Sequence, residues 1–182
     1  MKTNRHRLSA AFLACGFALS LTACGGGREY AVPKEACGVP LNEKVLEPFL
    51  VDGEKFRIVG DSLIETGTKT WGSCSLSVDD WLVVGLAVYR VDKIYDPMAK
   101  LDAFRFDNRA AMEDLPFPGK GAVGDFNSMV STSCSALTAD SLVVHVNVSI
   151  KSEGDVAERR RNIEEFTLDL VPKVKKKMGC TA

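Results

Sequence analysis

The first 24 residues constrain this chain most, because they decide which part of it is left to fold. Three basic residues, Lys2, Arg5 and Arg7, precede an uncharged apolar run from Leu8 to Ala23. This run is shorter than the ~20 residues that an apolar helix needs to cross a bilayer. A basic segment followed by a short apolar one is typical of a secretory signal peptide. We therefore expect residues 1–23 to be removed and the remaining chain to fold outside the cytoplasm.

The apolar run ends in Leu21, Thr22, Ala23 and Cys24, and three glycines follow directly. These residues resemble the lipobox of bacterial prolipoproteins, in which a type II signal peptidase cuts before a Cys that carries a diacylglyceryl group. The resemblance implies that Leu21 is the apolar first position, Ala23 the small residue before the cut, and Cys24 the lipidated start of the mature chain. It also implies a membrane partner, reached through diacylglyceryl-Cys24 at the extracytoplasmic face of the cell membrane. The alternatives are an uncleaved membrane helix and an ordinary signal peptide with a chance Cys.

The cysteines divide by position. Cys15 falls in the signal peptide and Cys24 carries the predicted lipid, which leaves an even number: Cys37, Cys74, Cys134 and Cys180. An even number of cysteines in an oxidising compartment favours two disulfides. They are not spaced as CxxC pairs, so we predict neither a zinc site nor another metal site. Three connectivities are possible. We prefer Cys37 with Cys74 and Cys134 with Cys180, because each bond then closes one half of the domain.

The mature chain is predicted to hold one domain. Removing 23 of the 182 residues leaves 159, enough for one domain with its own core. The removed segment holds three basic and no acidic residues, so 20 Lys and Arg face 24 Asp and Glu, a net charge of −4. Nucleic-acid binding requires a positive surface and is not expected. We assign residues 24–36 to the lipidated Cys and a flexible tether, and residues 37–182 to a single globular domain.

Several segments alternate between apolar and polar residues, which indicates half-buried strands. We predict a strand pair over 55–59 and 62–64, turning at Gly60 and Asp61, and a third strand over 71–78. The clearest strand is 82–90, whose residues Leu82, Val84, Leu86 and Val88 share one face. A strand over 142–150 follows later in the chain.

Helix signals stand between these strands. Asn42 can cap a short helix, and Asp96 with Pro97 predicts the start of a helix that runs to residue 112. Asp155 and Glu158 fit a capping box at the start of the last helix. Gly179 stands where its C-cap belongs, and Pro172 predicts a kink or an early stop. The stripe at helical spacing in this helix is Ile163, Phe166, Leu170, Val174 and Met178.

An internal duplication is indicated by matches at a constant offset of 60 residues. The matched pairs are Cys74 and Cys134, Ser75 and Ser135, Asp80 and Asp140, Leu82 and Leu142, Val83 and Val143, Val84 and Val144, Val88 and Val148, and Phe106 and Phe166. The alternative is two similar hairpins. In either case the order of helices and strands predicts an α+β domain, an antiparallel β-sheet packed with helices and ending in a long C-terminal helix.

Candidate catalytic groups are few. His145 is the only histidine after the signal peptide, so a Ser-His-Asp triad or a histidine metal site depends on this residue alone. We interpret Gly119, Gly121 and Gly124 as a turn, since no strand-to-helix context supports a dinucleotide site. The carboxylate pair Asp79 and Asp80 lies between two predicted strands and is interpreted as a turn. We interpret residues 159–161, three arginines, as a solvated charged face of the last helix.

One surface is a candidate binding site. If the strands at 82–90 and 142–150 are neighbours, the face away from their Leu and Val rows combines Trp81 and Tyr89 with His145 and Asn147. Aromatic side chains around small residues such as Gly85, with a few polar groups, are typical of ligand sites.

The layout resembles, loosely, that of uncharacterised small lipoproteins of high-GC Gram-positive bacteria: a lipobox, a short tether and four cysteines in an α+β domain. We expect a non-catalytic envelope domain that binds a partner or a small ligand and needs no cofactor. The alternatives are an envelope hydrolase that uses a carboxylate pair or His145, and a purely structural envelope lipoprotein.

Overall fold

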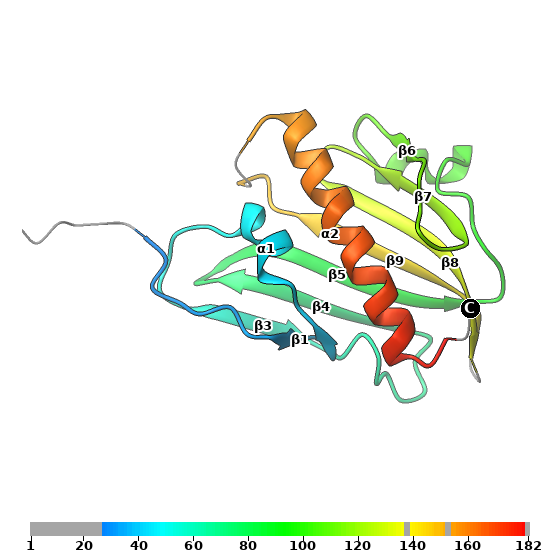
Figure 1. The fold of residues 1–182 in the computed structure, drawn as a ribbon, viewed down its shortest axis with the longest axis horizontal. Helices are drawn as coiled ribbons and strands as arrows, with labels where there is room; N and C mark the ends of the chain where they lie inside the picture. The colour runs from blue at the N-terminus through cyan, green and yellow to red at the C-terminus, as the bar shows by residue number, and fades with distance from the viewer. Residues whose placement is uncertain (1–26, 137–138, 152–153, 181–182) are drawn as a thin grey trace, which may run out of the picture.

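The computed structural model describes residues 27–136, 139–151 and 154–180. Its main body is a seven-stranded antiparallel sheet with a long helix, α2, across one face (Figure 1). The strand order is β3-β4-β5-β9-β8-β7-β6. The strands are β3 (Phe56–Gly60), β4 (Trp71–Val78), β5 (Trp81–Val91), β6 (Ala110–Met112), β7 (Gly119–Val123), β8 (Asn127–Ala136) and β9 (Ala139–Val148). The predicted α+β class is therefore confirmed in outline.

The helix α2 (Val156–Lys177) begins and ends where the sequence predicts. Asp155 caps it, because its Oδ1 accepts a hydrogen bond of 2.8 Å from the Glu158 N–H. At the other end Gly179 has a φ of +70°, a conformation open to glycine, and the next N–H, of Cys180, bonds the Lys175 carbonyl at 2.9 Å. The helix continues past Pro172, so the predicted early stop is wrong. Pro172 removes only one intrahelical hydrogen bond, and buried side chains on both sides of it hold the helix on the sheet. These residues are Ile163, Phe166, Leu170, Val171 and Val174.

The side of the sheet that faces α2 forms the core. Alternate residues of the two central strands are buried there: Val84, Leu86 and Val88 on β5, and Leu142, Val144 and Val146 on β9. A short helix α1 (Glu43–Leu46), capped by Asn42 as predicted, leads into the 3-10 turn η1 (Glu47–Phe49) and closes one end of this layer. Phe49 meets Phe166 of α2 edge to face, with ring centroids 5.8 Å apart. Burial of these rows against α2 is the main stabilising contribution.

Both predicted disulfides are present, with the preferred connectivity. Cys37 lies in the turn between β1 (Glu35–Ala36) and β2 (Val39–Pro40), and its bond to Cys74 joins this turn to β4. Cys134 of β8 bonds to Cys180, directly after α2. The two bonds therefore tie the N-terminal hairpin and the last helix to opposite halves of the sheet.

The chain before Cys37 also contacts the domain. Glu29 N–H donates to the Gly53 carbonyl at 2.9 Å, and the Tyr30 hydroxyl donates to the Val51 carbonyl at 2.7 Å. Tyr30 packs on Phe56, with ring centroids 5.8 Å apart. These contacts hold residues 28–36 on the domain, although the sequence placed them in a flexible tether.

The helix predicted over 97–112 is wrong. The segment holds only the 3-10 turn η2 (Lys100–Arg105) and the short strand β6. Asp96 does cap a turn, because its Oδ1 accepts from the Met98 N–H at 2.9 Å. The Arg109 guanidinium then bonds the carbonyl of Pro97 at 2.6 Å, which folds the segment back on itself. Leu101 and Phe104, which would be the apolar packing positions of such a helix, are 85% and 79% exposed.

Two further strand predictions are wrong. Residues 62–64 form no strand, because the Ser62 hydroxyl accepts from the Ile64 N–H at 3.1 Å and turns the chain. β3 pairs with β4 instead, with Gly60 opposite Cys74. On β5 a bulge leaves Leu82 opposite Ser77 while Val84 faces Leu76. This shift turns Leu82 outward, 47% exposed.

The segment with Gly119, Gly121 and Gly124 contains strand β7 and was wrongly assigned to a turn. Its glycines allow close packing. A Cβ at Gly119 would lie 2.5 Å from the Ser131 carbonyl oxygen, and one at Gly121 would lie 3.0 Å from Met112. The missing side chains therefore let β7 fit between its neighbours.

The 60-residue offset coincides with a feature of the sheet. β5 and β9 are neighbours at its centre, and Leu86 pairs with Val146, its counterpart at that offset. The first half does not end in the helix predicted over 97–112, since η2 and β6 follow β5. Across the residues described, no helix is long and apolar enough to span a membrane.

Candidate functional site

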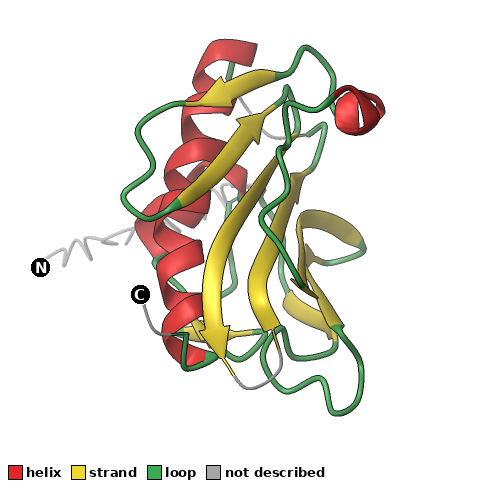
Figure 2. Cartoon of the chain, turned by 90° about the vertical axis from the view of Figure 1, so that its right-hand side faces the viewer, coloured by secondary structure: helices red, strands yellow, loops and turns green. Residues whose placement is uncertain are grey.

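The face of the sheet away from α2 carries the candidate site. Residues 92–109, which we call the strap, connect β5 to β6 and pass over the outer face of β8 and β9. Figure 2 shows α2 on one side of the sheet and the helical turn η2 of the strap on the other. The outer face of β3, β4 and β5 is left open.

Hydrogen bonds from both ends hold the strap on the sheet. The Tyr95 N–H donates to the Ser131 hydroxyl at 2.9 Å, and the Asn127 amide donates to the Arg105 carbonyl at 2.6 Å. Lys120 of β7 binds the Asp96 carboxylate at 2.7 Å. These contacts set the height of the strap above the strands.

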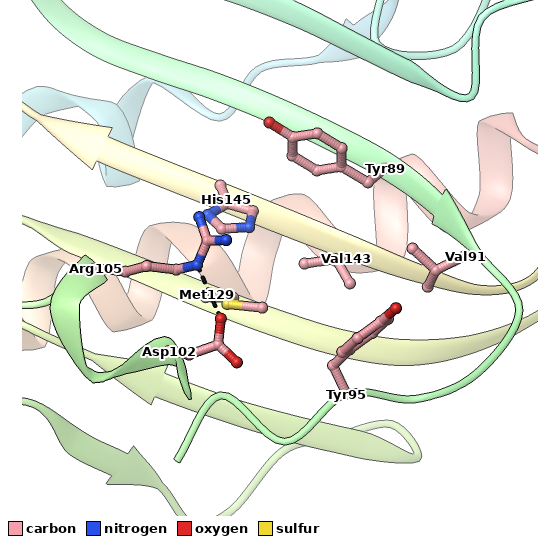
Figure 3. Close-up of a pocket in the computed structure, with 8 residues that line it drawn as sticks. All are labelled: Tyr89, Val91, Tyr95, Asp102, Arg105, Met129, Val143 and His145. Atoms are coloured by element: carbon pink, nitrogen blue, oxygen red, sulfur yellow. Dashed lines mark hydrogen bonds and ion pairs between the residues drawn. The ribbon is translucent and has the colours of Figure 1, made fainter. Parts of the chain in front are cut away.

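A cavity of about 300 Å³ lies between the strap and the sheet (Figure 3). Its floor comes from β5, β8 and β9, and Tyr95 with η2 covers one side. The lining residues are Tyr89, Val91, Tyr95, Asp102, Arg105, Met129, Val143 and His145. Apolar and aromatic side chains around a few polar groups are typical of small-molecule sites.

His145 lies on the floor of this cavity beside Tyr89. The two rings meet edge to face, with centroids 5.5 Å apart and planes at 73°. Burial, with a smaller effect of the Arg105 charge, lowers the pKa of His145 to about 4. The imidazole is therefore neutral at physiological pH.

Arg105 is the cation of the cavity. Its Nε binds the Asp102 carboxylate at 2.8 Å, three residues earlier in η2, and its guanidinium lies 4.9 Å from the Phe104 ring centre. Arg105 lines the same cavity as His145, and its charge contributes to the lowered pKa of that ring. The paired charges give the cavity a polar group without a net charge.

Of the four residues predicted to bind a ligand, the structure brings two together. Tyr89 and His145 line the cavity. Asn147 lies on the same outer face, two residues after His145 on β9 and opposite Gly85 of β5, and does not line the cavity. Trp81 stands at the far end of β5, where Lys151 lies 3.0 Å above its ring centre.

The sequence reasoning missed the strap residues Tyr95, Asp102 and Arg105, because it assigned most of this segment to a helix. It also missed Met129 of β8. One signal was available: the apolar spacing of Leu101 and Phe104 does not continue for a second turn, as an amphipathic helix requires.

The carboxylate pair Asp79 and Asp80 lies outside the cavity. The Asp79 carboxylate accepts hydrogen bonds from the backbone of Glu54 and Lys55, the closer at 2.9 Å, and so holds a turn. The Asp80 side chain is 91% exposed, 3.6 Å from Arg57. In the described part of the chain no three potential metal ligands lie together.

Comparisons of this chain with protein-family models, curated proteins and solved structures find no match.

Proposed function

We propose that this protein is a lipid-anchored, disulfide-stabilised extracytoplasmic domain that binds a small ligand in the strap cavity and catalyses no reaction. The observation that carries the proposal is the cavity of about 300 Å³ with Tyr89, Tyr95 and Met129 around the Arg105–Asp102 pair. Rigid aromatic walls bind a flat ligand at low entropic cost, and the ion pair offers donors and an acceptor to orient it.

The anchoring part of the proposal rests on the lipobox resemblance at Leu21 to Cys24. Two disulfides are consistent with an oxidising compartment. Arg28 is bridged to Gly53, so lipidation at Cys24 would leave three residues, and at most about 15 Å of chain, between the lipidated Cys and this bridge. The domain would then work directly at the bilayer surface.

Detergent phase partitioning and intact mass test the anchor. The native protein is expected to enter the detergent phase and to begin with an acylated Cys24, whereas Cys24→Ala is expected to remain an unprocessed precursor. Normal maturation of Cys24→Ala, or a native product without acyl mass, would overturn the anchor and leave the cavity proposal standing.

Binding is favoured over hydrolysis by the state of His145. With a pKa of about 4 it is a weak base at neutral pH. Its ring contact is with Tyr89 and its neighbouring cation is Arg105, neither of which serves as a nucleophile here. The Asp79 carboxylate is occupied by backbone N–H groups.

Anilinonaphthalene sulfonate, a fluorescent aromatic anion, is a suitable first probe of the cavity. We expect it to bind and to shift the ring signals of His145, which is the only histidine after His6 and therefore a unique NMR reporter. Tyr95→Ala and Arg105→Gln should weaken this binding. The control is Leu101→Ser, which removes an apolar side chain of η2 that is 85% exposed and does not line the cavity. The proposal would be contradicted if the control variant lost probe binding while Tyr95→Ala kept it.

We also propose that the two halves of the sheet arose by internal duplication. The pairing of Leu86 with Val146 supports this, because a twofold axis through this pair also relates the pair Val84–Val148 to the pair Val88–Val144. Equivalent sites should accept exchanged side chains. The free energy of unfolding of the double variant Leu86→Val with Val146→Leu should then fall by less than the two single changes predict together. Additive losses would count against the duplication.

A further inference from the structure

The strap leaves open a part of the outer sheet face that is made of small side chains. Ser73, Ser75 and Ser77 alternate along β4 with buried residues. Across the ladder Ser73 lies opposite Ala87 and Ser75 opposite Gly85. We call these five residues the serine face. None of the three hydroxyls makes a hydrogen bond to any residue that the structure describes.

An aromatic pair joins the serine face to the cavity. Trp71 and Tyr89 are directly opposite each other on β4 and β5, and each is 41% exposed. Tyr89 also lines the cavity beside His145. The cavity, the aromatic pair and the serine face therefore form one continuous surface. From Trp71 to Ser77 it extends along about 20 Å of strand.

Three cations beside this surface are paired with carboxylates. Lys69 lies 5.4 Å from the Trp71 ring centre and binds Asp61 at 2.9 Å. Arg57, opposite Ser77, is 3.6 Å from the Asp80 carboxylate. In the cavity Arg105 is paired with Asp102. The surface therefore matches a ligand without net charge.

Among uncharged ligands, a sugar chain fits these groups best. Aromatic rings offer apolar faces to C–H groups, and serine hydroxyls both donate and accept hydrogen bonds. An extended peptide is a poorer match, because both edges of β4 and β5 are already paired within the sheet. A purely apolar ligand would leave three hydroxyls unsatisfied.

We propose that the ligand of the cavity is the end of an uncharged oligosaccharide whose following sugars lie over Trp71 and the serine face. This inference rests on the proposed function, because the end sugar occupies the strap cavity. The chain offers a matched comparison. Trp81 is the other tryptophan, 54% exposed at the opposite end of β5.

The test uses the mature protein in a detergent without a sugar headgroup. A glycan array of uncharged and acidic oligosaccharides identifies binders, and fluorescence titration measures affinity. In Trp81→Phe, Trp71 is the only indole left, so its emission reports on this surface alone. We expect uncharged oligosaccharides to bind more tightly with increasing length and to change the Trp71 emission.

Variants then locate the binding site. Trp71→Ala should weaken binding about tenfold or more, the loss of about 1.4 kcal/mol of contact energy. Ser75→Val should weaken it as well, because it removes a hydroxyl from the middle of the face. Trp81→Ala should bind like the parent protein. The His145 ring signals check that each variant keeps its fold.

Failure of this inference can be told apart from failure of the proposed function. If anilinonaphthalene sulfonate shifts the His145 signals but no uncharged oligosaccharide on the array binds, the ligand class is wrong and the cavity proposal stands. If neither binds, both are wrong. Equal losses in Trp71→Ala and Trp81→Ala, or binding of acidic glycans only, would also overturn the inference.

Discussion

Arg160 binds Asp125 through two guanidinium nitrogens, with Nε at 2.9 Å and Nη2 at 2.6 Å from the same carboxylate oxygen. The other oxygen of Asp125 accepts from the Asn108 amide at 2.7 Å. Next to this pair, Arg159 is buried, donates to the Asp125 carbonyl at 2.7 Å and lies over the Phe126 ring. The interpretation of residues 159–161 as a solvated face is therefore wrong for Arg159. One turn, between β7 and β8, holds the first turn of α2 and the end of the strap.

Asp125→Ala should release the end of the strap. The hydrogen bond from Asn108 and the contact with Arg160 hold the pKa of Asp125 below its usual range, so its carboxylate favours the folded state. This contribution is present above the unfolded-state pKa of about 4 and is lost as pH falls through the lower folded-state pKa. Hydrogen exchange should show faster exchange of the Asn108 amide. A separate titration with anilinonaphthalene sulfonate should show weaker binding in the cavity.

Asp61→Ala is the control for this change. Asp61 also pairs with a cation, Lys69 at 2.9 Å, but its side chain is 56% exposed and far from the strap in the sheet order. Exposed pairs contribute little to stability. If both variants change exchange in the strap equally, Asp125 does not hold it.

Removing the Cys134–Cys180 bond with two Ser substitutions should lower the free energy of unfolding by about 4 kcal/mol, as loop entropy predicts for 46 residues. The bond lies directly behind the C-cap at Gly179, so the last turn of α2 should also lose protection from exchange. Denaturant titration measures the change. Intact mass with and without reductant provides the control, because four hydrogens should be gained by the parent and two by the variant.

Features that depend on residues close together in the sequence could be predicted. The caps at Asp155 and Gly179 act within one helical turn, so the ends of α2 followed from local chemistry. The side-chain parity of β5 and β9 placed Tyr89 and His145 on one face, because alternation along a strand needs no tertiary information. The disulfide connectivity was also predicted, because each bond was expected to close one half of the domain.

The strap could not be predicted, because distant contacts decide its path. Asp96 and Pro97 form a proper helix start, and a helical turn does follow. The chain leaves it because Arg109 binds the Pro97 carbonyl and Tyr95 binds Ser131 of β8. Three of the eight residues that line the cavity were missed for this reason, since Tyr95, Asp102 and Arg105 belong to the strap.

Leu170→Ala and Leu101→Ala should separate the packed helix from the exposed strap. Leu170 on α2 is 2% exposed and Leu101 on η2 is 85% exposed. The buried change should lower the free energy of unfolding by about 2–5 kcal/mol, because it leaves a cavity. The exposed change should stay within about 0.5 kcal/mol. A large loss in Leu101→Ala would mean that residues 97–112 pack as a helix after all.

Stability should depend on pH through His145. Its folded-state pKa of about 4 lies below its ordinary value of 6.5, so the folded state favours the neutral ring. Between these two values the unfolded chain binds the proton more readily, and stability should therefore fall as pH is lowered from about 6.5 to about 4. The loss attributable to this residue is at most about 3 kcal/mol. Urea titrations from pH 4 to 7 measure it, and His145→Gln should remove this part of the slope while the carboxylates keep theirs. An NMR titration midpoint near 6.5 in the folded protein would show that the ring is solvated and that the cavity does not enclose it.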